Sequence, residues 1–245
     1  ADYFAVQGMR PDGSRAPEFE RLLDIDNLID YMLILFYTGN NDGPGGVHVS
    51  WPNNYYSLYN RKQPDGFKYF AHDMEHSLDV GTYDMTQSDN AALTRPQYLN
   101  PYSLHVRLIE NARYRKRFKE RTEMHFFGDG VFADDVAVAR LNKRAAEIEI
   151  AILAHSARWG DASSPRPRTP RDWERAVDRS RAWLKGRGNA VISQFVRRGW
   201  YDGQLPPKFV RGGGANLFLM SDGGTIYFTT DGTDPLRGDG DLNPN

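Results

Sequence analysis

The sequence contains no cysteine, which excludes disulfide bonds and thiolate chemistry. No apolar run approaches the roughly 18 residues that a helix needs to span a bilayer. Neither sign of charge is in excess, because Lys plus Arg total 31 and Asp plus Glu total 32. No overall field therefore favours nucleic acid or a membrane surface. The first residues (ADYFA) lack the positively charged start and the apolar stretch of a signal peptide. The cellular compartment stays open on these grounds.

A chain of 245 residues can bury one well-packed core and can contain one or two domains. Its most informative stretch is residues 24–79. Within it, short polar clusters follow apolar or aromatic segments that can hold them in place; the clusters are residues 40–42, 53–54 and 73–76.

Residues 24–39 predict a buried helix. Asp24 or Asp26 can cap its first turn, and Gly39 can end it in the left-handed conformation. Apolar side chains occupy nearly all sides of its second half, which is typical of a helix inside a protein core. The helix would then present Asp42 on a loop at the end of a fixed rod.

Two aromatic-rich segments follow, at residues 55–59 and 67–70, with a turn signal at residues 63–66 between them. This pattern predicts a β-hairpin. Asn54 stands just before the first strand and Asp73 just after the second, so the hairpin would bring these two residues close together.

Three long helices are predicted after residue 100, at about 101–122, about 134–159 and from Thr169 to about residue 196. Gly160 can close the second helix, and Gly186 or Gly188 can break the third in two. Their tryptophans have the spacing of helix core positions; these are Trp159, Trp173 and Trp183.

After residue 205 the composition changes. A strand is predicted from residue 224, with a turn at residues 231–232, as the beginning of a small β module. The chain is therefore expected to have an α+β, mostly helical fold. It would be divided into a domain at residues 1–205 and an incomplete β module at 206–245, and both ends suggest a piece of a longer polypeptide.

Asp42, Asn54 and Asp73 together match the needs of phosphoryl transfer. One carboxylate orients the attacking hydroxyl and accepts its proton, while an Asn oxygen and a second carboxylate hold Mg²⁺ on the phosphates. Each residue taken alone is equally typical of a turn. The combination is what indicates a site.

A competing pattern is His72-x-x-Glu75-His76, which has the form of an inverted zinc-protease motif. Glu147 or Glu149 could supply a third ligand. Two His four residues apart share a face only on a helix, and this segment follows a strand-like one. Two histidines in a loop without metal are the simpler interpretation.

Three ordered segments resemble the CotH (spore-coat protein H) kinase family of atypical bacterial protein kinases. They are LIDYMLILFYTGNND at residues 28–42, NYYSLYNR at 54–61 and GFKYFAHDMEHSL at 66–78. The later helices, including SARWGD at residues 156–161, are also similar to the family, so that the resemblance spans about residues 15–205.

The resemblance implies a large kinase lobe that transfers the γ-phosphoryl group of ATP to protein hydroxyls. Asp42 would be the catalytic carboxylate. Asn54 and Asp73 would hold Mg²⁺ and the nucleotide, with Glu75 as a further acidic residue beside the metal. The partner would be a protein with an acceptor hydroxyl, with no role for nucleic acid or a membrane span; the oligomeric state is not indicated.

The segment IYFTTDGTDP at residues 226–235 is similar to the chitobiase/hexosaminidase C-terminal repeat, a β module often attached to exported bacterial enzymes. This similarity implies an exported or cell-surface bacterial protein.

The sequence departs from the family pattern in three places. Gly43 stands where an aromatic residue is usual, residues 45–50 lengthen the loop before Asn54, and His72 replaces a Trp. Nothing before residue 24 matches a nucleotide-covering lobe with its phosphate-binding Lys or Arg. We therefore expect these 245 residues to bind Mg-ATP weakly or not at all. The alternatives left open are a non-catalytic surface or matrix binding protein on a kinase-like fold, and a zinc hydrolase.

Overall fold

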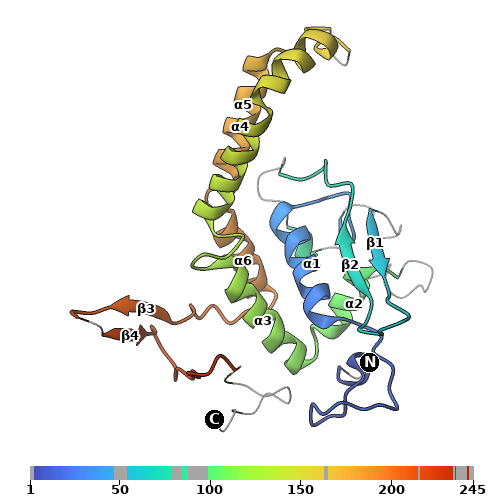
Figure 1. The fold of residues 1–245 in the computed structure, drawn as a ribbon, viewed down its shortest axis with the longest axis vertical. Helices are drawn as coiled ribbons and strands as arrows, with labels where there is room; N and C mark the ends of the chain where they lie inside the picture. Colours follow the sequence, from blue (N-terminus) through green and yellow to red (C-terminus); the bar gives the residue numbers. More distant parts are fainter. Residues whose placement is uncertain are drawn as a thin grey trace.

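The computed structural model describes residues 3–46, 54–78, 84–87, 99–162, 165–214 and 216–233, together with residues 235 and 242. Six α-helices, two short 3₁₀ turns and two separate two-stranded antiparallel sheets occur in these residues. Figure 1 shows the helices α1, α2, α3 and α6 gathered in one body with the β1–β2 hairpin on its side, and α4 and α5 extending away from it. The mixed, helix-rich content agrees with the predicted α+β class.

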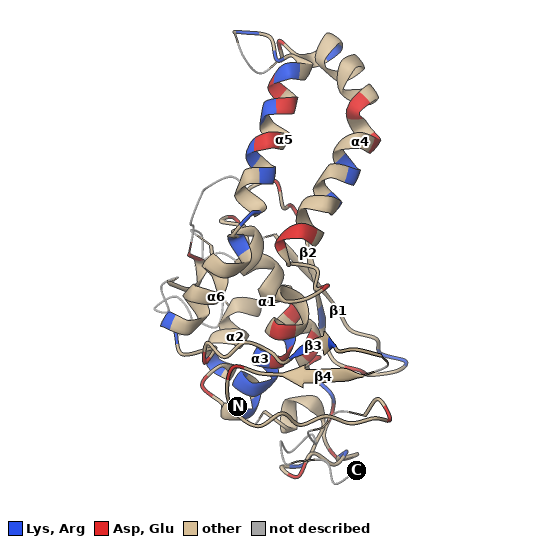
Figure 2. Cartoon of the chain, turned by 90° about the vertical axis from the view of Figure 1, so that its left-hand side faces the viewer, with Lys and Arg blue, Asp and Glu red and all other residues tan. Residues whose placement is uncertain are grey.

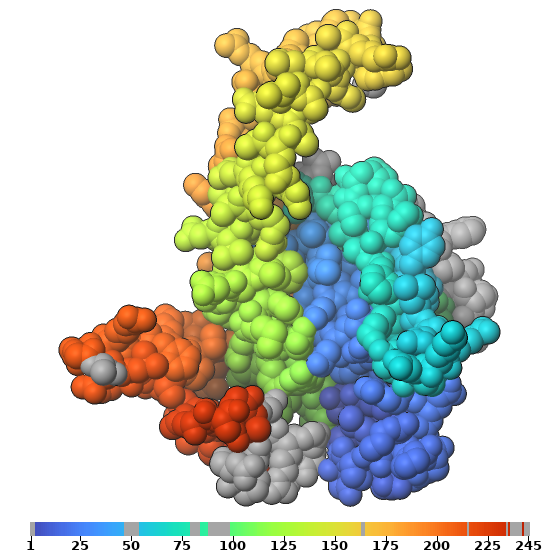
Figure 3. Space-filling view, in the orientation of Figure 1, coloured from blue at the N-terminus to red at the C-terminus, as the bar shows by residue number. Residues whose placement is uncertain are grey.

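Helix α1 (Ile25–Thr38) is the buried centre of this body. Its N-terminus is capped by Asp24, whose carboxylate accepts the backbone N–H of Asn27 at 3.0 Å. Gly39 ends it with a φ of 63°. Nine of its residues are buried, and on the face shown in Figure 3 it is visible as a narrow blue strip between the green helices and the cyan hairpin. The predicted buried helix is confirmed, and its two ends lie where the sequence predicts.

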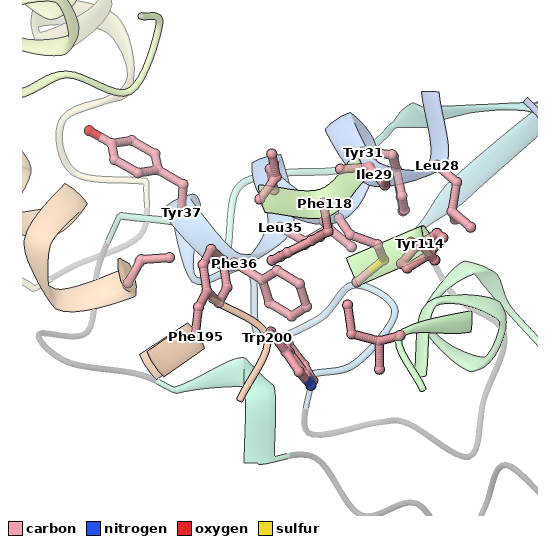
Figure 4. Packing of buried hydrophobic residues seen from close by; sticks show 14 of the residues in the cluster. Leu28, Ile29, Tyr31, Leu35, Phe36, Tyr37, Tyr114, Phe118, Phe195 and Trp200 are labelled. Atoms are coloured by element: carbon pink, nitrogen blue, oxygen red, sulfur yellow. The ribbon is translucent and has the colours of Figure 1, made fainter. Parts of the chain in front are cut away.

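Aromatic side chains from several helices meet around Phe36 of α1 (Figure 4). Its ring centroid lies 5.5 Å from that of Phe195 and 5.6 Å from that of Trp200. His105 packs edge-on at 5.4 Å and is fully buried, which lowers its pKa to about 3, so it is neutral. Burying a large apolar side chain contributes about 1.5–3 kcal/mol each, so this cluster fixes the position of α1.

The predicted hairpin is present as β1 (Tyr55–Leu58) and β2 (Lys68–Ala71), which pair antiparallel with Tyr55 opposite Ala71. Asn27 of α1 attaches the hairpin to the helix, because its side chain accepts the N–H of Tyr69 at 2.5 Å and donates to the Tyr69 carbonyl at 3.2 Å. The hairpin is therefore held against the same rod that leads to Asp42.

The prediction of a single helix at 101–122 is wrong. This stretch forms two helices, α2 (Pro101–Leu108) and α3 (Ala112–Phe126). The break occurs because the side chain of Asn111 accepts the backbone N–H groups of Arg113 and Tyr114 and caps a new helix. The chain turns between them so that α3 can run beside α1.

Two arginines of α3 face two aspartates one turn apart on α1. Arg117 donates from Nε and Nη2 to the carboxylate of Asp26 at 2.7 and 2.6 Å. Arg121 makes the same paired contact with Asp30, and His125 adds a third at 2.9 Å. Paired Arg–carboxylate contacts are both strong and directional, so they set the register of α3 along α1.

Helix α4 (Asp134–Trp159) and helix α5 (Pro170–Leu184) form an extended antiparallel arm that carries charges of both signs along its length (Figure 2). The predicted helix at 134–159 is confirmed, and Gly160 follows it in a right-handed conformation. Within the described part of α4, Ala137 is the one buried residue. Trp159 is 52% exposed, so its predicted core position is wrong. None of the described helices is long and apolar enough to cross a membrane.

The predicted break of the third helix occurs at Gly186, which has a φ of 81° and separates α5 from α6 (Arg187–Arg197). Gly188, the other predicted break, lies inside α6. The break lets α6 turn back and pack on α1.

The predicted strand from residue 224 is wrong: in the described part of the C-terminal region, the strands are β3 (Lys208–Arg211) and β4 (Leu217–Met220). They form a hairpin that projects from the body (Figure 1). Residues 212–214 lie in the connection between the two strands. Asp231 makes the predicted turn, accepting the N–H of Thr233 at 3.0 Å.

Asp30 provides a test of the α1–α3 contact. Burial raises the pKa of Asp30, but the hydrogen bonds from His125 and Arg121 and the charge of Arg121 outweigh burial and hold this pKa below its usual value. The folded state therefore binds the proton less tightly than the unfolded state. The stabilisation is complete above about pH 4 and is lost as the pH falls through the lowered folded pKa.

We expect Asp30→Asn to lower the free energy of unfolding at neutral pH by about 1–3 kcal/mol. Urea unfolding should show that this difference shrinks in acid, as the wild-type carboxylate is protonated. Asp222→Asn, at an exposed position, is the control and should change stability by less than about 0.5 kcal/mol. A penalty for Asp30→Asn that is the same at neutral and acid pH would contradict the assignment.

Candidate functional site

The loop that leaves α1 carries Asp42 and is folded tightly. The backbone N–H of Asp42 donates to the side-chain oxygen of Asn40 at 3.2 Å, and Asn40 is fully buried. The loop turns back through residues 43–46, where the N–H of Gly46 donates to the carbonyl of Gly43 at 2.9 Å. Asp42 is half-buried at the rim of this turn.

Glycines make this turn possible. A Cβ on Gly46 would lie 2.0 Å from the carbonyl oxygen of Asn41, and a Cβ on Gly45 would lie 2.6 Å from the ring of Tyr102. Both distances are too short for non-bonded atoms. The glycine-rich segment after Asp42 is thus required by the close approach of the loop to itself and to α2.

Asn54 is in direct contact with Asp42. Its side-chain nitrogen donates to the carboxylate Oδ2 of Asp42 at 2.7 Å and to the Asp42 carbonyl at 3.2 Å. The amide nitrogen is thereby committed to Asp42, which leaves the carboxamide oxygen of Asn54 as a possible metal ligand. The structure thus joins the helix-end loop to the start of the hairpin.

Asp73 lies at the same end of the hairpin. Because Tyr55 pairs with Ala71, the residue before β1 and the residues after β2 leave the hairpin side by side. Asp73 is exposed. Both Asp73 and Asn54 adopt the left-handed backbone conformation, with φ of 53° and 49°. Left-handed non-glycine residues are uncommon and gather at functional sites.

Glu75 is exposed, and its carboxylate lies 3.8 Å from the Nε2 atom of His76. The segment from His72 to His76 is not helical, so the spacing that a two-histidine zinc motif requires is not realised there. His72 instead packs edge-on against Tyr56 at 4.7 Å. The geometry does not support a zinc hydrolase.

No group of three or more His, Cys, Asp or Glu side chains that could hold a metal occurs in the described residues. Mg²⁺ keeps several waters and is usually held by one or two carboxylates together with substrate phosphates. Asn54 and Asp73 fit that sparse donor set, and they fit a closed protein cage of zinc type poorly.

Two buried polar residues support the site from the protein interior. The sequence alone assigned no role to either of them. Arg187, only 3% exposed, donates to the carbonyls of Tyr37 and Phe36 at 2.8 and 2.7 Å, and so caps the end of α1 that leads to Asp42. Asn40 is the second. Its place in the cluster at residues 40–42 was visible in the sequence, but its burial was not.

The site thus places a carboxylate, oriented by an amide, beside a strained hairpin end that carries further acidic side chains. Residues 6–191 match the model of a family described as CotH kinase protein. The match covers more than half of the chain, and the chain belongs to this family. No curated protein and no solved structure matches the chain.

Gly46 provides a test of the turn behind Asp42. A methyl group in Gly46→Ala has to displace the backbone at Asn41, so we expect a loss of stability of about 1–3 kcal/mol. Thermal unfolding measures it. Gly213→Ala is the control, because no atom lies within 4 Å of its Cβ position. Equal melting temperatures for the two variants would contradict the tight turn.

Proposed function

We propose that the chain is the large catalytic lobe of a CotH-like protein kinase, which transfers the γ-phosphoryl group of ATP to a protein hydroxyl group. The observation that carries this proposal is the 2.7 Å contact between Asn54 and Asp42, two residues of the predicted trio that are 12 apart in sequence. Family membership supports the reaction class. The left-handed backbone at Asn54 and Asp73 supports the choice of these residues.

Asp42 acts as the base. Its carboxylate accepts the proton of the acceptor hydroxyl as that oxygen bonds to the γ-phosphorus, while the bond from the γ-phosphorus to the bridging oxygen breaks and ADP leaves. The hydrogen bond from Asn54 orients the Asp42 carboxylate. A base positioned in this way contributes about 10²–10⁴ in rate.

Asn54 and Asp73 hold Mg²⁺, the first through its carboxamide oxygen and the second through its carboxylate. When bound, the ion neutralises charge on the phosphate oxygens. Glu75 supplies further negative charge near the metal. Both proposed ligands flank paired residues of β1 and β2, so the hairpin holds them at the same end of the sheet.

The wider assignment follows from the same proposal. Residues 1–205 form the catalytic domain, and residues 206–245 begin a chitobiase-like β module. The protein is exported or displayed on a bacterial cell surface, and its partner is a protein substrate with an acceptor Ser or Thr.

Asp42→Asn in the full-length protein tests the reaction. We expect transfer of labelled γ-phosphate from ATP to protein to fall by about 10²–10⁴, because an amide cannot accept the proton. Asp222→Asn, at an exposed position remote in sequence, serves as the control and should retain full transfer. Equal transfer by wild type and Asp42→Asn would refute the role of Asp42.

A non-catalytic binding protein on the same fold is the second candidate. It is favoured by large apolar side chains on the projecting elements, such as Ile150 of α4 at 82% exposed and Phe209 of β3 at 70% exposed. The same labelling experiment separates the two functions. Absence of transfer by both wild type and Asp42→Asn, with every other component active, would favour the binder.

Nucleotide affinity is a separate prediction. We expect residues 1–245 alone to bind Mg-ATP weakly, because a cation on a covering lobe normally shares the phosphate charge. Isothermal titration with Mg-ATP measures the affinity, with AMP as the control ligand. Tight binding by these residues alone would refute the need for a further lobe.

A further inference from the structure

The two segments that carry the proposed acidic residues are joined behind the site. One is residues 38–42, which leave α1, and the other is residues 73–78, which leave β2. The N–H of Leu78 donates to the carbonyl of Thr38 at 2.9 Å, and the N–H of Asn41 donates to the carbonyl of His76 at 3.4 Å. These are main-chain contacts that many side chains would allow.

Asn40 makes the side-chain contact between the same two segments. Its carboxamide oxygen accepts the N–H of Asp42 at 3.2 Å, and its carboxamide nitrogen donates to the sulfur of Met74 at 3.0 Å. One end of this side chain therefore fixes the residue proposed as base. The other end fixes the neighbour of Asp73.

The environment leaves little freedom for this side chain. Asn40 is 0% exposed. A Cβ on Gly43 would lie 3.0 Å from the Asn40 nitrogen and 3.3 Å from Leu35, so the glycine leaves room for the carboxamide. Gly43, which stands where an aromatic residue is usual in the family, thus makes room for the buried side chain of Asn40.

Few side chains can replace this bridge. Asn offers a donor and an acceptor on a short stem, whereas Asp lacks the donor and Leu lacks both. A thioether is a weak acceptor, so the contact with Met74 contributes little energy by itself. Its effect is geometric, because an error of about 1 Å between catalytic groups can cost about 10² in rate.

We propose that Asn40 is a positioning residue that sets the separation of Asp42 and Asp73, with Met74 as its counterpart. The proposal rests on the function proposed above, since Asn40 acts only through those two residues. It predicts that removing the bridge changes metal binding and turnover more than it changes the fold.

The experiment compares two variants of the full-length protein. Asn40→Leu keeps the number and branching of the side-chain heavy atoms and removes both hydrogen bonds, and Met74→Leu removes the sulfur acceptor. Asn189→Leu is the matched control, because it removes the carboxamide of an exposed residue outside the site. Mn²⁺ binding is titrated by electron paramagnetic resonance, and kcat and KM are measured for phosphoryl transfer. Thermal unfolding is recorded for every variant.

We expect Asn40→Leu to lower kcat by about 10- to 100-fold and to weaken Mn²⁺ binding at least about 5-fold, with KM for the protein substrate unchanged. Met74→Leu should show the same pattern at about 3- to 10-fold. The double variant should be no worse than Asn40→Leu, because both substitutions remove one bridge. Asn189→Leu should match wild type in kcat and Mn²⁺ affinity.

Wild-type kcat and Mn²⁺ affinity in folded Asn40→Leu would overturn the proposal, as would strictly additive losses in the double variant. If Asn40→Leu does not fold, Met74→Leu decides alone, and unchanged values there overturn it. Failure of the proposed function would differ: wild type would then show no transfer, or transfer would survive both Asp42→Asn and Asp73→Asn.

Discussion

The burial of α1 is the constraint on which the rest of the structure depends. A helix with apolar side chains on nearly every side is stable only when other elements cover it. The β1–β2 hairpin, α2, α3 and α6 each pack on it. Because each neighbour is placed relative to the same rod, the end of the rod is fixed in space, and Asp42 is fixed with it. The packing of the core therefore also determines the geometry of the candidate site.

Polar contacts then select one arrangement among those that burial allows. Asn27 joins α1 to β2, the Arg117–Asp26 pair and the Arg121–Asp30 pair join it to α3, and Arg187 joins its last turn to α6. Burial has no direction, whereas these contacts have strict geometry. Each contact fixes either the register of a neighbouring element along α1 or the position of one end of α1. Together they account for the close approach of the end of α1 to the end of the hairpin at the site.

The elements that project from the body have a different character. Along α4 and on the β3–β4 hairpin, large apolar side chains remain exposed. These elements contribute few residues to the core. Apolar spacing alone predicts Trp159 to be a core position, because spacing reveals which residues share a face and not whether anything covers that face.

Local signals in the sequence determined the ends of α1, the β1–β2 hairpin, the start of α5 and the break at Gly186. Caps, turns and left-handed glycines depend on interactions within a few residues, so a short stretch of sequence is enough to predict them. The same signals identified Asp42, Asn54 and Asp73 as candidates. Only the tertiary structure decided the break before α3, the position of the C-terminal strands and the bridge from Asn40 to Met74. The bridge joins residues 34 apart in sequence, and such a contact exists only after α1 has brought the two segments together.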